Sequence, residues 1–161
     1  MATILDAVNS NALEAYELPA WETRQTIRSL WVNPELWDWV DMTPELYDEK
    51  HGRGGRTLDE HLDQTFCDFR CSKIFPAGDL RQLMPVKHGV RKLHPPRLRI
   101  YGWCPAPDQF VAVAGALEAA TKADKGLNDR KLEEVLEFIR RNKLEDTVLL
   151  GDNRAVFPSQ D

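Results

Sequence analysis

The sequence of 161 residues has no long hydrophobic run and few cysteines. No stretch of about 18 apolar residues occurs, so we expect neither a transmembrane helix nor a membrane partner. Residues 1–6 contain no cationic side chain and carry an acid at position 6, which argues against a secretory signal. Three cysteines are an odd number, so we expect free thiols in a reducing, cytoplasmic compartment.

Standard motifs for metals and nucleotides are also missing. Cys67 and Cys71 are four residues apart and follow His61, but a zinc site needs a second pair of ligands at a standard spacing. Residues 52–56 are rich in Gly and Arg and could cradle an anion, yet they lack the strand and the Lys-Ser/Thr of a P-loop. We therefore expect no metal and no cofactor, and we interpret residues 52–56 as a surface loop.

Positive charge is scarce overall and concentrated in one segment. The formal net charge is −5, but residues 71–110 carry seven cations and two acids, a net of +5. Residues 1–70 carry six cations and fourteen acids, a net of −8. Exposed like charges repel unless a partner neutralises them. An RNA backbone and an acidic protein surface are two such partners, and the sequence leaves both open.

The first part of the chain is predicted to be helical. An apolar stripe near helical spacing is formed by Leu18, Trp21, Ile27, Leu30 and Trp31. Two helix-start signals follow, Asn33-Pro34 and Thr43-Pro44, in which a capping side chain precedes proline. Thr57 with Glu60 has the spacing of a capping box and predicts a further helix.

From about residue 66 the pattern changes toward strands. Residues 66–75 alternate imperfectly and could form one strand, and residues 98–103 and 110–117 form a predicted hairpin. A stripe at Leu132, Val135, Leu136 and Ile139 predicts a helix, capped by Asn128 or Asp129, that runs to about Asn142. The predicted fold is α+β: a small antiparallel sheet, with an N-terminal helical subdomain (1–65) and a C-terminal helix packed on it. Residues 66–161 hold the sheet and that helix, and both parts form one unit.

The segments 90–93, 97–103 and 109–113 together resemble the core of RelE/HigB-like proteins, including their phage-associated relatives. The resemblance covers about residues 80–142. It implies a small twisted sheet with helices on one side and metal-independent cleavage of messenger RNA, typically on the ribosome. It also implies RNA, the ribosome and a small antitoxin as partners. Where HigB-like proteins carry Phe and paired Lys, this chain keeps only Lys122.

Candidate site residues come from the cationic segment. Cleavage of this kind uses the 2′-hydroxyl as nucleophile, so it needs a base and a cation beside the phosphate. Arg97, Arg99 and Tyr101 alternate along a predicted strand, so we expect them to share one face and contact phosphate and base. His88 or His94 is the candidate base. The candidate RNA contacts are Lys87, Arg91, Lys92 and Lys122. An ordinary solvated sheet face would show the same pattern.

A second function fits the acidic N-terminal region. Trp37 and Trp39 stand among acids and could bind a protein partner, because Trp is enriched at binding hot spots. This reading describes a non-catalytic phage or mobile-element protein that binds and inhibits a host protein. The tryptophans could equally fill the seam between the helical region and the sheet.

Overall fold

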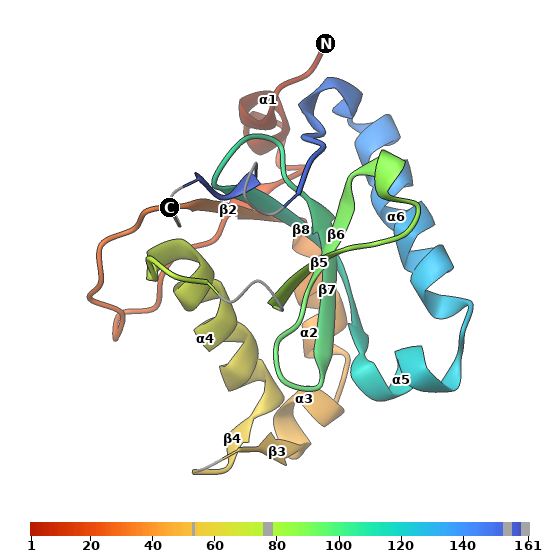
Figure 1. The fold of residues 1–161 in the computed structure, drawn as a ribbon. Coiled ribbons are helices and arrows are strands. Elements are labelled where there is room, and N and C mark those ends of the chain that lie inside the picture. Colours follow the sequence, from red (N-terminus) through yellow and green to blue (C-terminus); the bar gives the residue numbers. More distant parts are fainter. Residues whose placement is uncertain (53, 76–78, 153–155, 159–161) are drawn as a thin grey trace.

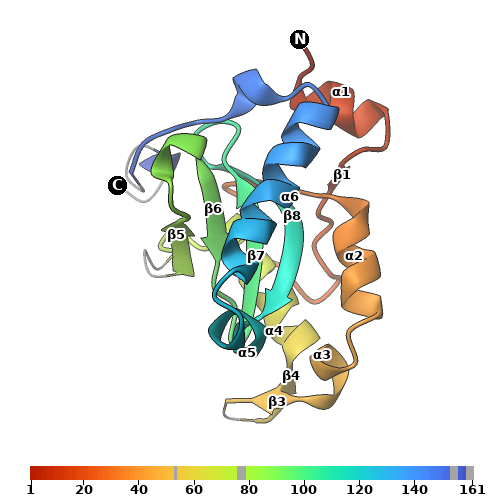
Figure 2. The same ribbon diagram turned by 90° about the vertical axis from the view of Figure 1, so that its right-hand side faces the viewer.

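The computed structural model describes residues 1–52, 54–75, 79–152 and 156–158. A six-stranded sheet with the order β1-β2-β8-β7-β6-β5 lies at its centre, and helices cover both faces (Figures 1 and 2). Its strands are β1 (Glu14–Ala15), β2 (Ser29–Val32), β5 (Leu80–Gln82), β6 (Val90–Leu93), β7 (Leu98–Trp103) and β8 (Gln109–Leu117). Strands β3 (Lys50–His51) and β4 (Arg56–Thr57) form a separate hairpin.

The helices are α1 (Ile4–Asn9), α2 (Pro34–Asp41), α3 (Glu45–Asp48), α4 (Leu58–Cys71), α5 (Glu118–Ala123) and α6 (Leu127–Arg141). Two short 3₁₀ helices, η2 (Val86–His88) and η3 (Glu145–Thr147), complete the elements. The predicted α+β class, with a mostly antiparallel sheet and a C-terminal helix packed on it, is confirmed. None of the described helices has both the length and the apolar character that crossing a bilayer requires.

The N-terminal region is only partly helical, because it also supplies two strands to the main sheet. The helix predicted from the stripe at residues 18–31 is wrong: residues 16–28 form no helix or strand, and Ser29–Val32 is β2. Proline at position 19 opposes a helix there. Strand β2 pairs with β8 in parallel, with Trp31 opposite Val111, whereas the other pairs of the main sheet are antiparallel.

Helix α4 replaces the strand that the alternation at residues 66–75 suggested. Leu58, Leu62, Phe66 and Phe69 recur at helical spacing and are all buried, so the period continues from upstream of the alternating window. Thr57 is the N-cap residue as predicted, but the capping box does not form. Its hydroxyl donates to the Asp59 carboxylate instead of accepting from a backbone amide.

Local start signals elsewhere are confirmed. The Asn33 side chain accepts a hydrogen bond from the Glu35 amide at the start of α2, and Pro34 is the first helical residue. Helix α3 also begins at the predicted Glu45, but Thr43 does not cap it: the N-cap residue is Pro44, and the Thr43 hydroxyl donates to the Trp39 carbonyl. Helix α6 buries Leu132, Val135 and Ile139 as the stripe predicts, although its N-cap is Gly126 and not Asn128 or Asp129.

Two hydrophobic layers hold the sheet. One face packs against α2, α3 and α4 and carries Leu98 and Ile100 of β7. The opposite face packs against α1 and α6 and carries Tyr101 and Trp103. Figure 1 shows α4 and α6 on opposite sides of the sheet, and Figure 2 shows α6 crossing β7 and β8. The one-sided helical cover that the family resemblance implies is therefore not the arrangement here.

Candidate functional site

Three cations lie on one face of three neighbouring strands. Arg81 of β5 lies opposite Lys92 of β6, and Lys92 lies opposite Tyr101 of β7. Directly opposite residues in a sheet point to the same face, and so do residues two apart on one strand. Arg99, two residues before Tyr101, therefore joins Arg81 and Lys92. We call Arg81, Lys92 and Arg99 the cationic row.

The cationic row is electrostatically strained. The pKa of Lys92 lies below its usual value because the side chain is partly buried, and because Arg99 and Arg81 add positive charge nearby. Cations on adjacent strands repel each other, so this arrangement lowers stability unless an anion neutralises it.

Glu118, the first residue of α5, supplies one such anion. Its carboxylate accepts from Arg99 at 2.7 Å and also binds Lys122. The hydrogen bond from Lys122, together with Arg99, holds the pKa of Glu118 below its usual value. Glu118 thus stands where an anionic ligand would meet the same two cations.

His94 lies directly after β6, between the cationic row and the segment at Asp79 that leads into β5. Its backbone amide donates to the Asp79 carbonyl at 2.8 Å. Its Nε2 is buried and has no hydrogen-bond partner among the described residues. Burial, followed by the charges of Arg99, Arg81 and Lys92, lowers the pKa of His94 to about 3. The ring is therefore neutral near pH 7, and because Nε2 is shielded, it meets a ligand only if the ring rotates.

A cleft of about 570 Å³ joins Arg81, Arg99 and His94 to the N-terminal region, and Lys92 does not line it. Its lining includes three of the four histidines of the chain (His51, His61, His94) and three arginines (Arg81, Arg97, Arg99). Asp68, Asp79 and Glu118 supply the acids. The cleft thus lies between α4 and the connection from β6 to β7, and it can accept an anionic ligand beside the neutral imidazole of His94.

Arg97 lies at the rim of this cleft and not on β7. It occupies the turn before the strand with a φ of 60°, so it does not continue the alternation of Arg99 and Tyr101. Its guanidinium is exposed and lies 3.8 Å from the Glu49 carboxylate. The predicted shared face of Arg97, Arg99 and Tyr101 is therefore wrong for Arg97.

Tyr101 belongs to the core. Its side chain is fully buried under α6, and its hydroxyl donates to the Asn128 side-chain oxygen at 2.6 Å. Burial raises the pKa of Tyr101 to about 12. In this position the ring is covered by protein and does not face the cleft, so it cannot stack a nucleobase there.

The remaining predicted residues separate into two groups. Lys92, His94, Arg97, Arg99 and Lys122 gather at the end of the sheet that carries the cleft. Arg91 lies on the opposite face of β6, buried, where it donates to the Gly151 carbonyl. His88 lies in η2 and does not line the cleft. Lys87 shares that 3₁₀ helix, and its side chain is outside the described structure.

Sequence reasoning missed Arg81, Glu118, His51 and His61. Two of them could have been found from sequence features: Arg81 belongs to the cationic segment, and Glu118 directly follows the apolar strand. No sequence feature pointed to His51 and His61, since only the folding of β3 and α4 places them at the cleft.

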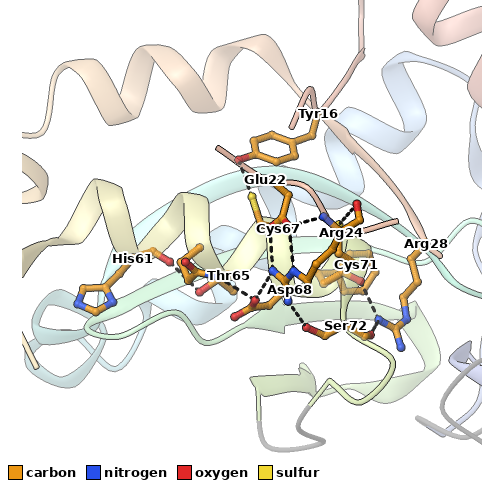
Figure 3. Close-up of polar contacts among 12 residues, drawn as sticks. Tyr16, Glu22, Arg24, Arg28, His61, Thr65, Cys67, Asp68, Cys71 and Ser72 are labelled. Atoms are coloured by element: carbon orange, nitrogen blue, oxygen red, sulfur yellow. Dashed lines mark hydrogen bonds and ion pairs between the residues drawn. The ribbon is translucent and has the colours of Figure 1, made fainter. Parts of the chain in front are cut away.

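A polar network fixes the N-terminal segment to α4 (Figure 3). Arg24 donates to Glu22, Asp68 and Ser72, and Arg28 donates to the backbone carbonyls of Phe69, Ser72 and Lys73. Asp68 also accepts from Gln64, another lining residue of the cleft. The network therefore holds the α4 wall of the cleft in place.

The cysteines are buried and free. The Tyr16 hydroxyl donates to Asp63 at 2.9 Å and lies 3.8 Å from the Cys67 sulfur (Figure 3 labels Tyr16 and Cys67). Burial raises the pKa of the Cys67 thiol to about 11, so it stays protonated near neutrality. Within the described ranges, no three His, Cys, Asp or Glu side chains gather as a metal site.

Trp37 and Trp39 lie in different surroundings. Trp37 packs against Tyr16 and Phe66, with ring centroids 6.2 and 6.1 Å away. Trp39 lines a second cavity of about 730 Å³ between α2 and α6, together with Gly115 of β8 and Phe138 of α6. The two indoles therefore form no common patch, because Trp37 lines a different cavity, of about 600 Å³, with Tyr16 and Asp63.

Comparison with known proteins gives no relative: no family model, no curated protein and no solved structure matches this chain.

Proposed function

We propose that the protein binds single-stranded RNA at the cleft and cleaves it without a metal, as a RelE/HigB-like endoribonuclease. The observation that carries the proposal is the cationic row beside His94, whose Nε2 is unpartnered among the described residues. A phosphodiester is the anion that such a row accommodates, because Arg and Lys bind phosphate oxygens through charge-assisted hydrogen bonds. Metal ligands are not required for attack by the 2′-hydroxyl.

The proposed reaction uses His94 and Arg99 of the cleft, together with Lys92 of the cationic row beside them. The 2′-oxygen forms a bond to phosphorus and gives its proton to neutral His94, while the bond from phosphorus to the 5′-oxygen breaks. Arg99 and Lys92 stabilise the extra negative charge that develops on the phosphoryl oxygens. The departing 5′-oxygen takes a proton from solvent. The products are a 2′,3′-cyclic phosphate and a 5′-hydroxyl.

His94 is a weak base in the free protein, since its pKa is lowered to about 3. Part of that lowering comes from Arg99, Arg81 and Lys92. A bound phosphate offsets these charges, so RNA binding itself raises the basicity of His94. The site therefore becomes competent for proton transfer when the substrate is present.

The test is incubation of purified protein with ribosomes and messenger RNA, with cleavage mapped by primer extension. We expect cleavage by the wild type and a loss of about 10²–10³-fold in rate for Arg99→Ala. Arg140→Ala is the matched control, because Arg140 is exposed on α6 and pairs only with Glu133 and Glu137 among the described residues. Cleavage that is absent, or that survives replacement of both Arg97 and Arg99 by Ala, would contradict the proposal.

A second candidate is a non-catalytic protein that binds and inhibits another protein. The groove between α2 and α6 favours it, because Trp39 and Phe138 flank its floor of Val113, Ala114 and Gly115. A stoichiometric partner should then be lost in Trp39→Ala. Trp37→Ala is the matched control, since Trp37 packs against Tyr16 and Phe66 and does not line this groove. Retention of the partner by a folded Trp39→Ala variant excludes this groove.

A further inference from the structure

Two histidines from the N-terminal half line the same cleft as the cations. His51 ends β3 and His61 lies in the first half of α4, and both side chains are half-buried. Their ring centroids are 5.8 Å apart with an interplanar angle of 66°. Both line the cleft with His94, Arg97 and Arg99. The chain thus brings an imidazole pair toward the phosphate-binding end of the sheet.

The imidazole pair is held in a defined orientation. Nε2 of His61 lies 2.7 Å from the His51 carbonyl oxygen. A carbonyl only accepts, so Nε2 carries the hydrogen and donates. Within the described residues neither ring makes another hydrogen bond, and the two rings contact each other edge to face.

The hairpin that carries His51 is anchored on both sides. Gly52 and Gly55 adopt φ values of 80° and 62°, which turn β3 back toward β4. Arg56 of β4 donates to Gln64 of α4 at 3.3 Å. Glu49, just before β3, lies 3.8 Å from Arg97 on the other side of the cleft. The hairpin and the residue before it therefore contact both walls of the cleft.

Imidazoles are the only aromatic rings among the described lining residues of the cleft. Tyr101, the expected stacking residue, is buried beneath α6. Single-stranded RNA is recognised by stacking unpaired bases on aromatic side chains, His included, while cations hold the phosphates. A ring pair without further internal partners, next to a cationic row, meets both requirements.

We propose that His51 and His61 form a base-binding subsite, against which a nucleobase stacks when the neighbouring phosphate lies on Arg99, which lines the same cleft. This inference rests on the proposed RNA binding. Every base presents a π-face, so the subsite recognises an unstacked base with little preference for its identity. The N-terminal half thereby supplies base contacts to a backbone site that the sheet supplies.

The test compares two fluorescent oligomers by anisotropy at low salt. One is a short oligoadenylate, and the other has the same number of phosphates but abasic units. Both carry 2′-O-methyl ribose, which removes the nucleophile and prevents cleavage. We expect the wild type to bind the oligoadenylate about tenfold more tightly than the abasic oligomer, the effect of one stacked base.

Three variants separate base contacts from backbone contacts. His51→Ala and His61→Ala should lose most of the preference for bases and keep the affinity for the abasic oligomer. Arg99→Ala should weaken both oligomers equally, and His88→Ala, outside the cleft, should change neither. His61→Gln retains an N–H group for the His51 carbonyl while removing the ring, so it serves if His61→Ala does not fold.

The outcomes distinguish this inference from the function on which it rests. Equal wild-type affinity for both oligomers, with Arg99→Ala weakening both, overturns the subsite and leaves backbone binding intact. A folded His61→Gln that keeps the full preference for bases, together with an unchanged His51→Ala, also overturns it. Failure of the wild type to bind either oligomer at low salt overturns both proposals.

Discussion

His94 is a neutral imidazole placed among three cations. Its pKa is about 3 in the folded protein and near the ordinary 6.5 when the chain unfolds. Between these values the unfolded chain binds more protons, so stability is full above about pH 6.5 and falls as the pH drops toward 3. The limiting slope for one group is about 1.4 kcal/mol per pH unit, reduced here because the ring is only half-buried.

We therefore expect the wild type to lose about 1 kcal/mol more stability than His94→Gln between pH 7 and pH 5. Urea unfolding at both pH values measures the two differences, and contributions of all other groups cancel in the comparison. Equal losses in the two proteins would show that the folded state does not disfavour a charged His94.

Glu118 forms ion pairs with Arg99 and Lys122, two cations that the proposed substrate needs. Glu118→Gln removes the competing charge from Arg99 and Lys122, so affinity for single-stranded RNA should rise about fivefold, the equivalent of an ion pair of about 1 kcal/mol. Fluorescence anisotropy measures the change. Glu134→Gln is the matched control, because Glu134 pairs with Lys131 on α6. Weaker binding by Glu118→Gln would mean that Glu118 orients Arg99 and does not compete with RNA.

At the scale of elements, Arg28 ties the end of α4 to the sheet. Its side chain is fully buried and donates to the carbonyls of Phe69, Ser72 and Lys73. Its Nε lies 3.5 Å from the Asp108 carboxylate. Burial lowers the pKa of Arg28, with Asp108 opposing that effect. The hydrogen bond to Phe69 satisfies a buried backbone acceptor, and those to Ser72 and Lys73 are partly buried.

Arg28→Met should therefore destabilise the protein by about 3 kcal/mol, because it leaves buried and partly buried acceptors unpaired. Arg24→Ala is the control from the same segment, because Arg24 also contacts α4 but from the surface. Arg24 is exposed and bound to Glu22 and Asp68, so its loss should lower stability by less than about 1 kcal/mol. Urea unfolding measures both, and equal effects would contradict the structural role of Arg28.

Trp39 of helix α2 packs closely over Gly115 of β8. A Cβ added to Gly115 would lie 2.4 Å from the Trp39 ring. Gly115→Ala should destabilise the protein by about 1–3 kcal/mol in the wild-type background and by much less in Trp39→Ala. A double-mutant cycle by urea unfolding measures this coupling. Equal effects in both backgrounds would show that the indole does not pack over Gly115.

Local patterns predicted some elements, and long-range packing decided the others. Strands β7 and β8, the starts of α2 and α3, and the stripe of α6 follow from neighbouring residues. The parallel pairing of β2 with β8 does not, because it joins Trp31 to Val111 across about half of the chain. Four residues of β2 also fit a helical stripe as well as they fit a strand.

The residues of the candidate site also divide into those that local patterns predict and those that long-range packing decides. Arg99, Lys92 and His94 were predictable because their types and the strand alternation are local features. Tyr101 was not, since alternation places it on a face but does not say that α6 covers that face. The contribution of His51 and His61 depends on the turn through Gly52 and on the position of α4, neither of which a local pattern specifies.

At the scale of the molecule, the uneven charge of the chain allows two explanations. Acids of residues 1–70 could neutralise cations of residues 71–110 within the fold, or RNA could neutralise them. Among the described residues, Glu49 and Arg97 form an ion pair between these two segments. Their charged groups are 3.8 Å apart, and both side chains are exposed. Exposed pairs of this kind contribute at most about 1 kcal/mol. We therefore expect the cationic end of the sheet to remain available to a polyanion.

The salt dependence of RNA binding tests this central claim most directly. Arg81, Lys92, Arg97, Arg99 and Lys122 gather at one end of the sheet, so we expect about three to five phosphate contacts. With labelled single-stranded RNA, log K should then fall linearly with log salt with a slope of about −2 to −3.5, and Arg99→Ala should reduce its magnitude by about 0.7. A slope near zero, or no binding at low salt, would mean that the protein's own acids neutralise the cations and would contradict the account.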